Sequence, residues 1–172
     1  MARETSISKF FALFDVLVRA FLACKGGWSR LVARTLQRSR RPLPEFSDLE
    51  GIENFRRENF KYRNDPLFGV LDYYQHPGHL MVSQRGDCDC QAVWVYKATQ
   101  QLPHHRAQVI TVVSPAIWKN HVFCAIEKPD KTLFSIDTRG LHSHLDEADM
   151  IAWYNAYFKT RYRPYATPYP FE

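Results

Sequence analysis

The chain has 172 residues, of which 45% are hydrophobic and 24% are charged, and it contains four cysteines. This composition is that of a globular protein of about one domain, and it excludes overall disorder, a collagen or coiled-coil chain and a disulfide scaffold. The net charge of +5 is uneven: residues 1–45 hold nine Lys/Arg and three Asp/Glu, whereas residues 46–172 hold fourteen and fifteen.

Residues 1–45 predict a basic helical extension. Apolar residues recur at helical spacing over 9–23, which gives the expected helix a broad apolar face. Asp15 and Arg19 stand four residues apart, so they can pair on the polar side of that helix. Because these two charges also interrupt the apolar run, we expect neither a secretory signal nor a simple membrane span.

The second half of this extension contains helix-breaking residues. We expect Gly26-Gly27 to end the first helix, a second basic helix over 29–38 and an extended linker over 40–44. A basic segment of this kind can contact an acidic protein face in a larger assembly, an anionic membrane surface or nucleic acid. No nucleic-acid-binding motif accompanies it, so we do not expect a nucleic-acid partner.

Residues 46–163 are expected to form the main domain, followed by an extended, Pro/Tyr-rich tail over 164–172. After short helices and loops over 46–80, the sequence predicts a helix over 87–101, strands over 106–113, 120–127 and 132–137, and a helix over 145–158. Pro129-Asp130-Lys131 predicts a hairpin turn between the last two strands. This order of elements indicates an α+β fold with a helix packed on a small antiparallel sheet.

The stretch Gly86-Asp87-Cys88 carries the clearest chemical signal. Gly86 permits a tight turn, and Asp87 is a suitable N-cap, which puts Cys88 in the first turn of the helix. The helix dipole and the unpaired N–H groups of that turn favour the thiolate, which is the nucleophilic form of cysteine. A backbone N–H there can also donate to a developing oxyanion.

A histidine and an aspartate follow in the order that a cysteine nucleophile needs. His121 opens one predicted strand and Asp137 closes the next, so a hairpin brings the two side by side. If the helix that begins at Cys88 packs across this sheet, the imidazole faces the thiol. The three residues then reproduce the logic of a nucleophile, a base and an orienting group.

These motifs resemble the transglutaminase-like cysteine peptidase superfamily, in particular the small bacterial transglutaminase-like cysteine proteinases. The likeness covers roughly residues 54–140: Asp72-Tyr73-Tyr74-Gln75-His76-Pro77, then Gly86-Asp87-Cys88, then a strand-borne His121 and a strand-borne Asp137. It implies a papain/transglutaminase-like core and cysteine-dependent hydrolysis of an amide bond in a protein or peptide. Cys88 would be the nucleophile, His121 the general base and acid, and Asp137 the orienter.

The resemblance also bears on neighbouring residues and on cofactors. Tyr74 and Gln75 fall where such enzymes often place an oxyanion or substrate-side group. Arg85 and Arg139 stand near the nucleophile and the orienter in the sequence, so either can bind a substrate carboxylate or serve only in a surface ion pair. The family usually has an acidic residue two positions after the nucleophile, and some members bind calcium nearby. Here that position is Cys90, which argues against calcium, and we expect no cofactor and no metal.

Three other interpretations of the cysteines remain open. Cys88 alone could be a structural cysteine, and Cys90 and Cys124 are expected to pack in the core, Cys124 on the strand face opposite His121. Cysteines and histidines together could hold zinc, but a C-x-C pair with scattered histidines is poor spacing for that ion. An amine in place of water as acyl acceptor would make the enzyme a transglutaminase.

A different class of function is also open. The basic extension and the tail have the character of docking elements, so the protein could be a structural or assembly component that retains the fold without catalysis. Small members of the superfamily occur among the proteins of tailed phages, which extends this alternative to a virion component. Without a clear signal sequence, we expect a cytoplasmic protein or one assembled in a virion or complex.

Overall fold

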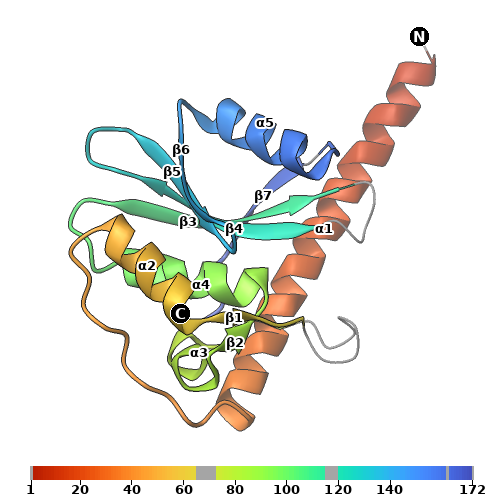
Figure 1. Ribbon diagram of the computed structural model, residues 1–172. Helices are drawn as coiled ribbons and strands as arrows, with labels where there is room; N and C mark the ends of the chain where they lie inside the picture. Colours follow the sequence, from red (N-terminus) through yellow and green to blue (C-terminus); the bar gives the residue numbers. More distant parts are fainter. Residues whose placement is uncertain (1, 65–72, 115–119, 162, 172) are drawn as a thin grey trace.

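The fold is α+β, with helices on both faces of one antiparallel sheet (Figure 1). The computed structural model describes residues 2–64, 73–114, 120–161 and 163–171. Within them lie five helices: α1 (Ala2–Thr35), α2 (Leu49–Asn59), α3 (Pro77–Ser83), α4 (Cys88–Thr99) and α5 (Glu147–Phe158). The main sheet has the strand order β6-β5-β4-β3-β7: β3 (Arg106–Val113), β4 (His121–Glu127), β5 (Leu133–Asp137), β6 (Gly140–His144) and β7 (Arg163–Thr167). The short strands β1 (Lys61–Tyr62) and β2 (Arg85–Gly86) form a parallel pair.

Helix α4 packs on one face of the main sheet, as predicted, and forms the centre of the core. Its sequence is apolar on nearly all sides, which suits a helix enclosed by other elements. Trp94 is fully buried there and stacks on Phe55 of α2 with ring centroids 5.6 Å apart. Cys124 of β4 belongs to the same buried cluster and therefore faces α4.

Helix α5 covers the opposite face of the sheet (Figure 1). Its Tyr154 is fully buried and stacks on Phe123 of β4, with the ring centroids 4.1 Å apart. Because neighbouring side chains of a strand point to opposite faces, His121 lies on this side with Phe123. Its ring centroid is 5.1 Å from that of Phe158, so the prediction that Cys124 faces away from His121 is confirmed.

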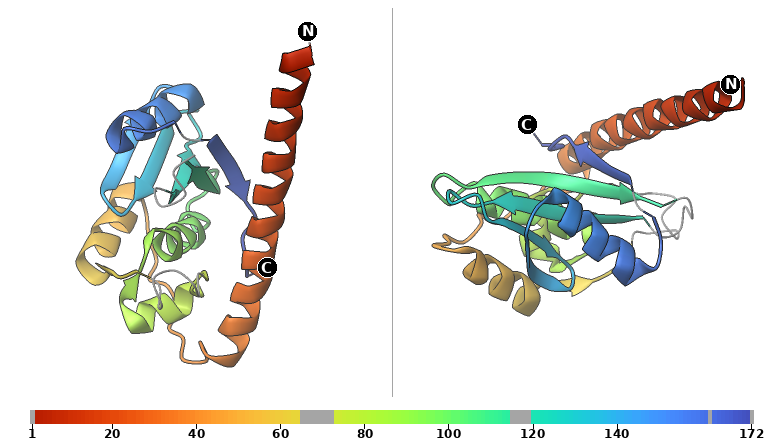
Figure 2. Two further views of the ribbon diagram at one scale, coloured as in Figure 1. Left: turned by 90° about the vertical axis from the view of Figure 1, so that its right-hand side faces the viewer. Right: turned by 90° about the horizontal axis from the view of Figure 1, so that it is seen from above.

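Helix α1 is continuous through Gly26-Gly27, so the predicted break and the second, separate helix are wrong. The helix runs along the side of the domain beside β7 (Figure 2). Contacts with the domain hold it: Ser29 Oγ accepts a hydrogen bond from the backbone N–H of Tyr74 at 2.8 Å, and Asp15 forms an ion pair with Arg163 at 3.2 Å. Such tertiary contacts outweigh the cost of about 1 kcal/mol for each glycine in a helix. No helix among the described residues combines the length and apolarity that crossing a bilayer requires.

The predicted strands and hairpin are confirmed, and two further strands extend the sheet. β4 and β5 pair antiparallel, with Cys124 opposite Ile136. β6 follows β5 after a short connection and enters at Gly140, whose φ of +144° favours glycine. β7 is the edge strand beside β3 and contains Pro164, which an edge position tolerates because its missing N–H breaks no ladder.

Candidate active site

The N-terminus of α4 is built as the sequence predicts. Asp87 is the N-cap, and its side chain accepts a hydrogen bond from the backbone N–H of Cys90 at 3.1 Å. Cys88 therefore occupies the first helical turn, where the helix offers its own backbone N–H no acceptor. Gly86 serves close packing, because a Cβ atom at this position would lie 2.8 Å from the Cβ atom of Cys90.

His121 and Asp137 form the predicted pair across the β4–β5 hairpin. The Nε2 atom of His121 lies 2.8 Å from Oδ2 of Asp137, and the Asp137 side chain is completely buried. Because a carboxylate only accepts hydrogen bonds, Nε2 carries the proton in this pair. Nδ1 is then the ring nitrogen that can take up a proton from another group.

Arg139 holds the far side of the Asp137 carboxylate. Its backbone N–H donates to Oδ1 at 2.7 Å, and its guanidinium lies 3.3 Å from Oδ2. Burial alone would raise the pKa of Asp137, but the hydrogen bond and charge of His121 and the N–H and charge of Arg139 outweigh it and lower this pKa. Asp137 thus stays ionised and keeps the imidazole oriented.

Cys88 and His121 line the same cavity, which has a volume of about 600 Å³. Aromatic side chains of β1 and α5 form much of its wall, and the guanidinium of Arg139 lies 3.9 Å from the ring centre of Tyr157. Asn120 also lines the cavity, and its Oδ1 accepts a hydrogen bond from the backbone N–H of Ser114 at 3.1 Å. The cavity is thus a partly aromatic recess with the thiol and the imidazole on its surface.

The pKa of Cys88 is shifted in the direction opposite to the sequence-based expectation. Burial raises this pKa above the usual value for a thiol, and the carboxylates of Asp89 and Asp87 raise it further. A backbone hydrogen bond from Val122 and the charge of Lys25 oppose the shift without reversing it. A thiol in these surroundings needs a neighbouring base to ionise near neutral pH.

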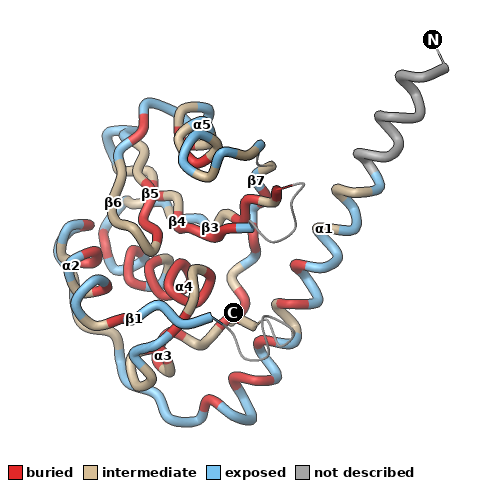
Figure 3. Tube along the Cα trace, turned by 45° about the vertical axis from the view of Figure 1, so that its right-hand side comes forward, coloured by how far each residue is buried: buried red, intermediate tan, exposed pale blue. Residues whose placement is uncertain are grey.

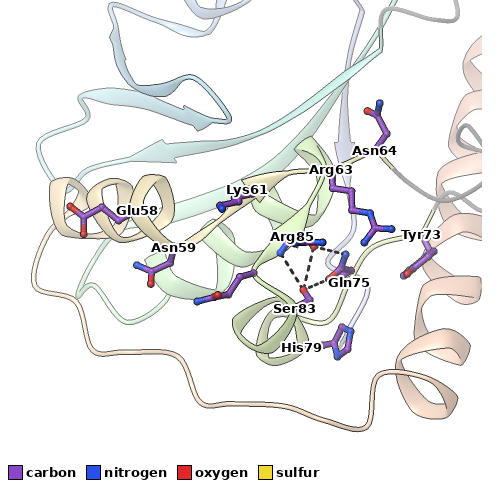
Figure 4. A pocket seen from close by; sticks show the side chains of 11 residues that line it. Glu58, Asn59, Lys61, Arg63, Asn64, Tyr73, Gln75, His79, Ser83 and Arg85 are labelled. Atoms are coloured by element: carbon purple, nitrogen blue, oxygen red, sulfur yellow. Dashed lines mark hydrogen bonds between the residues drawn. The ribbon is translucent and has the colours of Figure 1, made fainter.

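The structure does not bring Tyr74, Gln75 or Arg85 to this cavity. Tyr74 is fully buried in the core, beneath the ammonium of Lys25 at 4.5 Å from its ring centre. Gln75 and Arg85 line a second cavity of about 530 Å³, where Gln75 Nε2 donates to the backbone carbonyl of Arg85 at 2.9 Å (Figure 4). This polar cavity is lined by neither Cys88 nor His121 and therefore lacks the nucleophile. Asp72, which opens the motif upstream of Gly86, lies outside the described residues.

One group of side chains near the nucleophile has the spacing of metal ligands. Asp87, Asp89 and Cys90 offer ligand atoms within 4.8 Å of one another, and the described residues contain no other such group. These residues do not fit a calcium site of the kind that some members of the resembled family have. Asp89 is already ion-paired with Lys25, and Cys90 offers sulfur where calcium takes oxygen. The cysteine–histidine set that zinc would need is likewise not assembled within the described ranges.

Some residues of the site were not predicted from the sequence, or were predicted in another role. Tyr157 and Phe158 lie in the predicted helix over 145–158 with no site role expected for them, yet both line the cavity. From the sequence, Arg139 is a candidate for binding a substrate carboxylate, whereas in the structure its backbone N–H and its guanidinium contact the carboxylate of Asp137. Tyr62 carries no signal in the sequence, because the parallel pairing of β1 with β2 joins residues far apart in the chain.

No model of a protein family matches this sequence, and no curated protein matches it either.

Proposed function

We propose that this protein is a cysteine-dependent amide hydrolase, a peptidase with a papain/transglutaminase-like core. The observation that carries the proposal is the 2.8 Å contact between His121 Nε2 and Asp137 Oδ2, with Cys88 on the wall of the cavity that His121 lines. Among the described residues, Cys88, His121 and Asp137 do not form a group whose ligand atoms lie close enough together to hold a metal ion, whereas a covalent acyl-transfer site uses a thiol, an imidazole and a carboxylate in turn.

The reaction begins with proton transfer from the Cys88 thiol to Nδ1 of His121. The thiolate attacks the carbonyl carbon of the scissile amide, and the carbonyl oxygen gains the negative charge of the tetrahedral intermediate. The backbone N–H of Cys88, at the positive end of α4, is a donor suited to that oxyanion. As the intermediate collapses, the C–N bond breaks and Nδ1–H of His121 protonates the leaving amine.

The second half of the reaction releases the acyl group. His121 takes a proton from water, and the resulting hydroxide attacks the thioester carbon of Cys88. The C–S bond breaks, the acid product leaves, and the thiol recovers its proton from His121. Asp137 holds Nε2 throughout and stabilises the imidazolium that forms in each half.

The raised pKa of Cys88 means that the reaction starts from the thiol and not from a thiolate. Burial and the two carboxylates that raise the pKa of Cys88 keep its thiol protonated before a substrate binds. Proton transfer then accompanies attack on the substrate, as in serine hydrolases. His121 is consequently indispensable for reaction near neutral pH.

A peptide library read by mass spectrometry tests the proposal. The wild-type chain should cleave members of the library and gain an acyl adduct on Cys88, and Cys88→Ser and His121→Ala should each lower the rate by a factor of about 10³ or more. Cys24→Ser is the matched control, because Cys24 is exposed on α1 away from the cavity, and it should leave the rate unchanged.

The same assay separates hydrolysis from transamidation when a primary amine is added. Incorporation of the amine into the product would identify an amine-accepting transglutaminase, whereas a free acid product identifies a hydrolase. Cleavage that persists in Cys88→Ser, or a complete lack of acyl adduct and cleavage across the library, would overturn the proposed function.

A further inference from the structure

The outer face of α1 carries a continuous apolar stripe. Leu13, Leu17, Phe21, Cys24, Trp28 and Leu31 follow one another at intervals of four, four, three, four and three residues, which places them on one side of a helix. The five large side chains among them expose between 44% and 59% of their surface. At 1.5 Å per residue the stripe is about 27 Å long.

This stripe is distinct from the face that holds α1 against the domain. The inward face is defined by the buried residues Leu22, Lys25, Ser29 and Val32, whose contacts include the ion pair between Lys25 and Asp89. Figure 3 shows the buried and exposed positions alternating along α1, with the buried ones turned toward the domain. The apolar stripe is therefore on a side of α1 that faces solvent and does not pack against the domain.

Arginines stand beside the stripe. Arg34 follows Leu31 by three residues and therefore flanks the stripe, and Arg30 lies one turn before Arg34 on the exposed side of α1; both are exposed and have no ion-pair partner among the described residues. Arg19 is not part of this group, because its guanidinium lies 6.0 Å from the ring centre of Tyr165 in β7. The one acidic side chain described on α1 is Asp15, which already contacts Arg163 and the hydroxyl of Tyr165. The outer side of α1 thus combines apolar side chains with uncompensated positive charge.

We propose that this face of α1 binds the surface of an anionic phospholipid bilayer. A helix with leucine, phenylalanine and tryptophan on one side and arginine beside them lies in the interface of such a bilayer, with its apolar side chains among the acyl chains and its cations at the phosphates. Trp28 is suited to that interface, because its ring is apolar and its N–H can remain hydrated.

Charge favours a lipid surface over a second copy of the chain. Two copies packed through the stripe would bring the uncompensated arginines of both into one interface, and like charges there oppose association. An anionic surface neutralises the same arginines. The bilayer is therefore the occupant that satisfies both the apolar and the charged side chains of this face.

Co-sedimentation of the full chain with lipid vesicles tests this inference without any measure of catalysis. We expect binding to vesicles of phosphatidylcholine and phosphatidylglycerol in equal parts, and little binding to pure phosphatidylcholine. The double variant Phe21→Gln/Leu31→Gln should weaken binding at least tenfold. Leu36→Gln is the matched control, because Leu36 is 77% exposed but lies just beyond the end of α1.

The charged part of the interaction has its own prediction. Arg30→Gln and Arg34→Gln should each weaken binding about fivefold at low salt, since a basic residue near an anionic surface contributes about 1 kcal/mol. Arg106→Gln, an exposed arginine of β3, should leave binding unchanged. Circular dichroism of each variant verifies that the fold is intact.

Two results would overturn the inference. One is that the wild type does not bind anionic vesicles, or that Phe21→Gln/Leu31→Gln binds them as tightly as the wild type does. The other is a concentration-dependent dimer in sedimentation equilibrium that this double variant abolishes while vesicles have no effect, since the stripe would then bind a second copy. A blue shift of tryptophan fluorescence on vesicle binding that Trp28→Phe removes would support it.

Discussion

Lys25 of α1 forms a buried ion pair with Asp89, the residue that directly follows Cys88. The two side chains expose only 7% and 3% of their surface. Burial by itself would raise the pKa of Asp89, but the neighbouring ammonium outweighs it and lowers this pKa. The N-terminal helix, which lies outside the resemblance to cysteine peptidases, is thus a structural support of the proposed nucleophile helix.

Removing the ammonium should destabilise the fold strongly. Lys25→Met leaves the Asp89 carboxylate as an uncompensated buried charge, which costs about 3–5 kcal/mol, and the double variant Lys25→Met/Asp89→Leu should recover much of that loss. Urea unfolding of the single and double variants measures both effects. A loss of less than about 1 kcal/mol in Lys25→Met, as for an exposed pair, would contradict the buried pair.

The Lys25–Asp89 pair also predicts a sign for the pH dependence. Because the pKa of Asp89 is lowered in the folded state, the pair contributes stability above the ordinary aspartate pKa of about 3.9 and loses it as the pH falls through the folded value. In Lys25→Met/Asp89→Leu this contribution to the acid-induced loss of stability should be absent.

Gly86 should not tolerate even a methyl group. In Gly86→Ala the new Cβ atom would lie 2.8 Å from the Cβ of Cys90 and 3.0 Å from Cδ1 of Leu80, and overpacking of this kind costs about 1–3 kcal/mol. Gly26→Ala is the matched control, because no atom lies within 4 Å of its added Cβ. Thermal unfolding should show that Gly26→Ala instead stabilises α1 by about 0.5–1 kcal/mol. Equal effects of the two substitutions would contradict the packing at Gly86.

Much of the site follows from local signals in the sequence. Asp87 before Cys88 is a capping signal within one turn of chain. The Pro129-Asp130-Lys131 turn predicts a hairpin that brings the start of β4 near the end of β5, where the side chains of His121 and Asp137 meet. An N-cap and a tight turn are formed by residues close together in the sequence, so both can be predicted without knowledge of the tertiary structure. The α+β class, the start of α4 and the His121–Asp137 pair were predictable for this reason.

The remaining features depend on tertiary packing. Gly26-Gly27 lowers local helix propensity, and only the contacts of α1 with the domain show why the helix continues. The burial that raises the pKa of Cys88 likewise arises from elements far away in the chain. The apolar periodicity near the N-terminus predicts a helix, but it cannot tell which face turns toward the domain and which toward solvent.

Asp137→Asn should disturb the tautomer of His121. The wild-type carboxylate accepts from Nε2–H, which leaves Nδ1 unprotonated, whereas an amide can donate its own N–H to Nε2 and favour the wrong tautomer. The corresponding change in serine proteases lowers the rate by about 10⁴, and we expect a loss of about 10²–10⁴ here. Long-range ¹H–¹⁵N NMR spectra of His121 report the tautomer directly. An unprotonated Nε2 in the wild type would refute this assignment.

His76 should give the fold a second pH dependence. Its Nδ1 accepts a hydrogen bond from the backbone N–H of Gly78 at 3.1 Å at the start of α3. Burial, with the nearby charge of Arg40, lowers the pKa of His76 from 6.5 to about 4. The unfolded chain therefore takes up the proton first as the pH falls, so stability should decline between about pH 6.5 and 4.

His76→Asn isolates this effect, because asparagine also accepts hydrogen bonds as an N-cap. Urea unfolding across this pH range should give a shallower decline in the variant, and an NMR titration of wild-type His76 should give a pKa near 4. An ordinary histidine pKa of about 6.5 would contradict the burial of the His76 ring from which this prediction follows.

The most direct test of the proposed triad is the rate of alkylation of each cysteine by iodoacetamide as a function of pH, read by peptide mass spectrometry. At neutral pH, Cys88 should react faster than the more exposed Cys24, because His121 accepts its proton. In His121→Ala, Cys88 should become slower than Cys24 and should react only at a pH well above the usual thiol pKa of about 8.5, because burial and the carboxylates of Asp89 and Asp87 still raise its pKa while no base remains to accept the proton. A Cys88 rate that is the same with and without His121 would contradict the triad.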